Sequence, residues 1–192
     1  MQKLLSEIRD CTVCSEHLPM GPRPIIAGTS KSKIILVSQA PGRKAHNHHK
    51  AWDDPSGKKL REWLGVTDEE FYNPNNFAIL PMGFCYPGKG KTGDLPPRKE
   101  CAPLWHEPFW GHLQNVKLTL LIGKYAQDRY LKTISKKNLT ENVSSYKDFL
   151  PHYFPLPHPS PVNRFWMAKN PWFESEVLPE LKYRIEAILK TG

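Results

Sequence analysis

The chain has 192 residues, 39% of them hydrophobic, and a formal net charge of +8 at pH 7. This length fits one domain spanning residues 1–192, since domains commonly hold ~100–200 residues. The apolar runs are far shorter than the ~20 residues that cross a bilayer, and the N-terminus lacks a signal-peptide core. We therefore expect a soluble, cytoplasmic, monomeric protein without a membrane partner, whose positive charge permits a polyanionic one.

The first third of the chain predicts a helix, a stiff bridge, a strand and a second helix. Leu4, Leu5 and Ile8 have the spacing of an amphipathic helix over residues 2–10. A bridge rich in Pro and Gly over 19–28 then leads into an apolar strand over 33–39. The following helical pattern covers 57–64, with Ser56 as its expected N-cap.

The rest of the chain alternates apolar runs with helical patterns. Runs at 77–80, 117–122 and 153–156 predict three more strands. Helical patterns lie around 100–114, 124–132 and 172–190. This alternation predicts an α/β fold in which helices cover both faces of a parallel sheet.

Four cysteines form two pairs. Cys11 and Cys14 make a Cys-x-x-Cys element, whereas Cys85 and Cys101 bracket a loop rich in Pro and Gly. In an intracellular chain, this arrangement favours metal ligation over disulfides. The alternative is that Cys85 and Cys101 are small buried hydrophobic residues.

Two polar segments directly follow predicted strands. The first reads Ser38-Gln39-Ala40-Pro41-Gly42 and the second His158-Pro159-Ser160-Pro161-Val162-Asn163. Loops at the carboxyl ends of strands in an open α/β sheet commonly bind ligands. Basic residues lie in predicted loops beside both segments, where they would contact phosphates or simply be solvated: Arg43, Lys44, Lys89, Lys91 and Arg164. His46, His48 and His49 lie near Arg43 and Lys44, so a partly protonated loop that faces phosphates is a simpler interpretation of them than a metal site.

The order of these motifs along the chain resembles the uracil-DNA glycosylase superfamily, most closely its iron–sulfur type, family 4. The resemblance implies a three-layer α/β/α sandwich with a short, mainly parallel four-stranded sheet. It also implies a DNA-repair hydrolase that binds DNA and cleaves the N-glycosidic bond of a flipped base, with uracil as the default substrate. A [4Fe–4S] cluster would be held by Cys11, Cys14, Cys85 and Cys101, with zinc or no metal as alternatives.

The resemblance further implies roles for single residues. His158 would donate a hydrogen bond to the departing base, and Trp52 would stack on that base beside Ala40, Pro41 and Gly42. Val162 would fill the gap that the flipped base leaves. The residues that would bind phosphates are Arg43, Lys44, Lys89, Lys91, Ser160, Asn163 and Arg164. From the residues alone, Trp52 could equally belong to the core, and Val162 could be ordinary loop packing.

Two positions depart from the family pattern. Gln39 stands where the family carries a Glu, and an amide cannot act as a general base. Pro81 stands where an Asn would read the uracil edge, and its side chain has no donor or acceptor. Asp53, or Asp54 beside it, could supply the missing carboxylate, although Asp before Pro is also a common turn former. The alternative function is a non-catalytic member of the superfamily that binds nucleic acid.

Overall fold

Four parallel strands form the central sheet of the computed structural model, which describes residues 1–191. They are β1 (Ile34–Val37), β2 (Phe77–Ile79), β5 (Leu118–Ile122) and β6 (Tyr153–Leu156), in the order β2-β1-β5-β6. Each neighbouring pair is parallel. Nearly every strand residue is buried, because helices cover both faces of the sheet, which explains the continuous apolar runs. All four predicted strands are confirmed.

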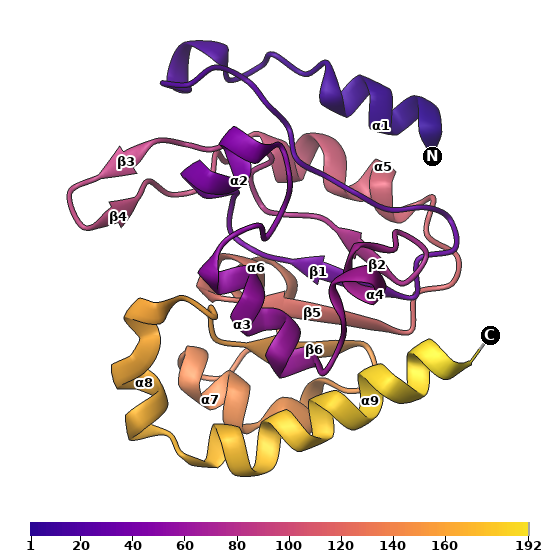
Figure 1. Cartoon of the computed structure of the whole chain (residues 1–192), viewed down its shortest axis with the longest axis vertical. Helices are drawn as coiled ribbons and strands as arrows, with labels where there is room; N and C mark the ends of the chain where they lie inside the picture. The colour runs from indigo at the N-terminus through magenta and orange to yellow at the C-terminus, as the bar shows by residue number, and fades with distance from the viewer. Residues whose placement is uncertain (192) are drawn as a thin grey trace.

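One face of the sheet packs against four helices (Figure 1). Ile34 and Leu36 of β1 point to this side, together with Leu118 and Leu120 of β5. The covering helices are α3 (Pro55–Leu64), α4 (Asp68–Tyr72), α7 (Leu139–Ser144) and α9 (Leu178–Lys190). A π-helical turn over Phe173–Val177 leads into α9, so this helical stretch begins close to the predicted residue 172.

The alternate residues of the same strands pack on the opposite face. Ile35 and Val37 meet an apolar cluster with contributions from the chain's first helix and from the segment after β2. The helices here are α1 (Gln2–Arg9), α5 (Glu107–Trp110) after a π-helical turn over Ala102–His106, and α6 (Lys124–Tyr130). The three-layer α/β/α fold is therefore confirmed.

Short elements surround the carboxyl ends of the strands. They are α2 (Arg43–His48), the hairpin of β3 (Lys89–Gly90) and β4 (Gly93–Asp94), and α8 (Arg164–Lys169), which follows a 3-10 turn over Pro161–Asn163. Two more 3-10 turns span Ser15–His17 and Tyr146–Phe149. In Figure 1, α2, the hairpin and α8 lie on the same side of the molecule. No helix within residues 1–191 is long and apolar enough to cross a membrane.

Two local predictions were wrong. Asp54, and not Ser56, caps α3: its carboxylate accepts the Gly57 N–H at 2.8 Å, and Pro55 takes the first helical position. The histidine-rich segment forms helix α2 and not a loop, and His46 is buried within the fold. Burial lowers the pKa of His46, with a further contribution from Arg23, so this ring does not supply a protonated surface.

Candidate active site

A cavity of about 470 Å³ opens at the carboxyl ends of β1 and β6. Both polar segments that follow these strands line it, although about 120 residues separate them in the chain. Because β5 lies between β1 and β6, the cavity spans the end of that middle strand. The polar side chains in its wall are Ser38, Gln39, Asp54, Ser56, Thr92, Asp94, His158, Ser160 and Asn163.

Backbone hydrogen bonds fix the first segment against the loop that follows β2. The Met82 N–H donates to the Ser38 carbonyl at 2.7 Å, and the Gly83 N–H donates to the Gln39 carbonyl at 2.9 Å. This pairing places Pro81 in the cavity wall close to the first segment. Both departures from the family pattern, Gln39 and Pro81, therefore line one cavity.

Trp52 and His158 lie face to face in this cavity. Their ring centroids are 5.7 Å apart and the ring planes are inclined by 29°. Trp52 has a left-handed backbone conformation, with φ of 58°. This geometry requires a glycine at position 57, because a Cβ there would lie 1.7 Å from the Trp52 carbonyl oxygen.

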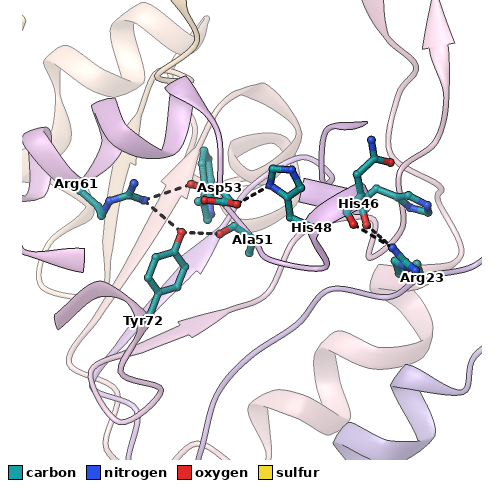
Figure 2. A network of polar contacts seen from close by, with 9 residues as sticks. Arg23, His46, His48, Ala51, Asp53, Arg61 and Tyr72 are labelled. Atoms are coloured by element: carbon teal, nitrogen blue, oxygen red, sulfur yellow. Dashed lines mark hydrogen bonds and ion pairs between the residues drawn. The ribbon is translucent and has the colours of Figure 1, made fainter. Parts of the chain in front are cut away.

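A polar network fixes the loop that carries Trp52 (Figure 2). The Tyr72 hydroxyl donates to the Ala51 carbonyl at 3.1 Å, and Arg61 donates to the Trp52 carbonyl at 3.3 Å. Arg61 also forms an ion pair with Asp68 at 2.7 Å. Helices α3 and α4 thus hold the aromatic wall of the cavity in one position.

His158 is held from its backbone and surrounded by protein. The Asn163 side-chain amide donates to the His158 carbonyl at 2.6 Å, which links the loop to the 3-10 turn beyond it. Burial lowers the pKa of His158, and the negative charge of Asp54 opposes only part of that shift. The imidazole is therefore neutral near pH 7, with one N–H available to donate.

The two candidate carboxylates, Asp53 and Asp54, lie in different surroundings. Asp53 lies outside the residues that line the cavity and contacts His48 at 2.6 Å, and this hydrogen bond lowers the Asp53 pKa. Asp54 lines the cavity, as does Asp94 at the base of the hairpin. Sequence patterns did not reveal Asp94, because only the folded loop between Cys85 and Cys101 carries it to the strand ends.

Comparison with known families adds one finding to this geometry. Residues 26–182 match the family model described as the Uracil DNA glycosylase superfamily. The chain belongs to this superfamily. Members of the superfamily are generally DNA glycosylases that act by hydrolysis. The matched range contains both strand-end segments and Cys85 and Cys101, but it begins after Cys11 and Cys14.

The predicted phosphate-binding residues either line the cavity or lie close in sequence to segments that line it. Ser160 and Asn163 line the cavity itself, as does Val162, the residue expected to fill the gap that a flipped base leaves. Arg43 and Lys44 begin α2, directly after the first segment, and Arg164 begins α8, directly after the second. Lys89 and Lys91 lie on the hairpin, whose residues 92–94 line the cavity. Their contacts with phosphates stay a prediction.

All four cysteines line one small cavity of about 20 Å³ between the N-terminal arm and the loop after β2. They are free thiols, and three of them are buried. Burial raises the pKa of Cys85 to about 11 and that of Cys101 to about 12, so both are neutral thiols unless a cation binds. Within residues 1–191, no three His, Cys, Asp or Glu side chains are arranged around a single metal-ion position.

Proposed function

We propose that the protein is a DNA glycosylase that hydrolyses the N-glycosidic bond of a damaged base flipped out of DNA. The observation that supports this proposal is the stack of Trp52 on His158 inside a cavity formed by both strand-end segments. An aromatic surface beside a hydrogen-bond donor is what recognition of a flipped base requires. The cavity volume, about 470 Å³, suits a small planar ligand.

The chemistry assigns complementary tasks to His158 and Asp54. As the bond from the sugar C1′ to the base nitrogen breaks, the electron pair leaves with the base, and the His158 N–H stabilises the resulting negative charge. The sugar becomes cationic, and the Asp54 carboxylate stabilises it in place of the Glu that Gln39 replaces. Water then bonds to C1′ and releases a proton, and the base takes up a proton.

Excision assays on oligonucleotides test this proposal. Strands containing uracil, hypoxanthine or a mismatch are incubated with protein and then cleaved with alkali, which cuts at the abasic sites formed. We expect cleavage of at least one damaged strand and a loss of about a hundredfold or more in rate with His158→Ala, while DNA affinity stays nearly unchanged. Wild-type activity that His158→Ala does not reduce would place the active site elsewhere.

Uracil is the first base to test, although Pro81 stands where the resemblance places the amide that would read its edge. Pro81 is buried in the cavity wall and its side chain cannot hydrogen-bond. The Pro81 carbonyl lies within 3.0 Å of the His106 Nε2 atom, so a base would compete with this bond. We therefore expect discrimination among bases to be weaker than a site with a dedicated amide would give.

A second candidate function is non-catalytic binding of nucleic acid through the same cavity. Gln39 favours it, because an amide in the first segment cannot act as a base or stabilise a cationic sugar as a carboxylate can. DNA binding without excision of any tested base, together with failure of Gln39→Glu to create activity, would support this function. Excision by the wild type would rule it out.

We also propose that Cys11, Cys14, Cys85 and Cys101 hold a [4Fe–4S] cluster, with zinc as the alternative. The support is that all four free thiols line one small cavity, although no three of these side chains surround a single ion position within residues 1–191. Such a group would link the N-terminal arm to the loop after β2 and would stabilise that loop, which also reaches the active site. Metal and sulfide analysis of the purified protein, together with its visible absorption spectrum, distinguishes an iron–sulfur cluster from zinc. The variant Cys101→Ser should contain less metal than the wild type.

A further inference from the structure

Two carboxylates from distant parts of the chain face the same small space in the candidate active-site cavity. A Cβ added to Gly42 would lie 3.6 Å from Asp94 Oδ2 and 3.9 Å from Asp54 Oδ2. The two oxygen atoms are therefore at most about 7.5 Å apart, a spacing at which paired carboxylates act on one glycosidic bond. All three residues line the cavity. Because glycine has no side chain, position 42 leaves room for a small molecule such as water beside both carboxylates.

The Asp94 carboxylate is oriented by a hydrogen bond to one of its two oxygens. The Tyr86 hydroxyl donates to Asp94 Oδ1 at 3.4 Å, and Oδ2 is the oxygen that faces Gly42. Tyr86 is itself fixed, because it is only 3% exposed and its ring lies beside His46, with centroids 6.1 Å apart. Asp94 thus has one oxygen bound to the protein and the other directed toward the first active-site segment.

The contacts of the two carboxylates suit them to different steps of a hydrolysis. Asp54 Oδ1 accepts the Gly57 N–H at the start of α3, so this carboxylate is a fixed negative charge inside the cavity. Asp94 lies at the base of the exposed β3–β4 hairpin, from which a proton can pass to bulk solvent. Gln39 cannot take up a proton, so the first segment itself supplies no general base. The hairpin therefore carries the carboxylate that is best placed to accept a proton.

We propose that Asp94 is the general base that accepts a proton from the attacking water. As the water oxygen bonds to C1′ of the sugar, its proton passes to the Asp94 carboxylate and then to solvent. The electron pair of the C1′–N bond leaves with the nucleobase. This inference rests on the proposed function and deepens it, because it moves the water-activating group from position 39, in the first segment, to the hairpin after β2.

Asp94→Asn tests this assignment, because an amide oxygen still accepts from Tyr86 but does not take up a proton. We expect the excision rate to fall about 100-fold or more, the usual contribution of a general base, while DNA affinity and melting temperature stay nearly unchanged. Asp128→Asn is the matched control. Asp128 is an exposed residue of α6 that pairs with Lys124 at 2.6 Å and does not line the cavity. This variant loses the same charge and should excise at the wild-type rate.

Azide distinguishes a general base from a negative charge that acts only by electrostatics. This small anionic nucleophile needs no deprotonation before it attacks. In Asp94→Ala, sodium azide should therefore restore release of the nucleobase and give a 1′-azido sugar, identified by mass spectrometry, whereas sodium chloride at the same concentration should not.

Three results would overturn the assignment of Asp94 while leaving the proposed function in place. They are a wild-type rate in Asp94→Asn, no restoration by azide, or restoration with an abasic sugar as the sole product. A wild type that excises none of the tested bases would instead contradict the proposed function, and this inference with it.

Discussion

Asp54 performs two tasks that a single substitution can separate. Its carboxylate caps α3, and it also lines the cavity near His158. Asn caps helices about as well as Asp, but it carries no charge. Asp54→Asn should therefore leave the melting temperature nearly unchanged while lowering the excision rate at least about tenfold, because the cationic sugar loses its counter-charge.

The neighbouring Asp53 provides the control for that measurement. Its carboxylate binds His48 and is not part of the cavity wall. Asp53→Asn should change the excision rate less than about twofold. Equal losses in the two variants would show that the charge acts at a distance and that Asp54 has no special position.

Gly57 determines where the Trp52 ring can lie. Any side chain at position 57 would collide with the Trp52 backbone, so Gly57→Ala must displace the loop that Arg61 holds. We expect a stability loss on the order of 1–3 kcal/mol and a loss of excision larger than that of Trp52→Phe, which keeps the loop in place. Denaturant unfolding and excision assays on both variants check this expectation.

At the scale of elements, a directed hydrogen-bond chain joins α5, its preceding π-helical turn and α6 to Pro81 in the wall of the candidate active site. The Pro81 carbonyl can only accept, so His106 Nε2 donates to it at 3.0 Å, and Nδ1 accepts from the Tyr130 hydroxyl at 2.7 Å. The Trp110 N–H donates to the same hydroxyl at 2.9 Å. This chain requires neutral His106, and burial lowers its pKa to about 4.

The depressed pKa of His106 predicts a specific pH dependence of stability. The unfolded state, with a histidine pKa of about 6.5, binds more protons than the folded state between that pH and about 4. Stability should therefore fall by about 3 kcal/mol as pH drops through this window. Urea unfolding at several pH values should show this slope in the wild type and a smaller one in His106→Gln; parallel curves would contradict the assignment.

The sequence predicted long elements better than short ones. The four strands were clear from buried apolar runs, and α9 from a pattern longer than three turns. Helices α2, α4, α7 and α8 span only five or six residues, less than two turns, so hydrophobic periodicity could not reveal them. The cap of α3 was misplaced because Ser56 and Asp54 both have capping side chains, and only the backbone decides between them.

The candidate site was predictable where it follows strand ends and not elsewhere. Gln39 and His158 could be placed because parallel strands bring their carboxyl ends to one edge of the sheet. The Trp52 position came from the family resemblance. Asp94 reaches the cavity through the path of a hairpin, which depends on tertiary packing and leaves no periodic pattern in the chain.

At the scale of the whole molecule, positive charge is expected to dominate affinity for DNA. Removing a side chain that binds one phosphate should lower the slope of log affinity against log salt by about 1, without changing sequence preference. We expect this result for Lys91→Ala and Arg164→Ala, measured by fluorescence anisotropy over a range of salt concentrations. Unchanged slopes in both variants would move the DNA-binding face elsewhere.

Lys190→Ala supplies the control for the salt experiment. Lys190 ends α9 and is paired with Glu186, and the C-terminal end of α9 lies across the molecule from the hairpin and α8 (Figure 1). The variant has the same net charge as the other two. Its salt slope should match that of the wild type, which separates local phosphate contacts from an effect of total charge.

The sheet order has a consequence for how the protein would lose activity on heating. Among the strands of residues 1–191, β6, which His158 follows, is an edge strand that pairs with β5 alone, whereas β1, which Gln39 follows, lies between β2 and β5. Edge elements open in local fluctuations that need less free energy than global unfolding. The segment that carries His158 would thus open while the segment that carries Gln39 stays in place. Thermal inactivation should therefore occur at a lower temperature than global unfolding. The backbone amides of β6 should also exchange with solvent faster than those of β1.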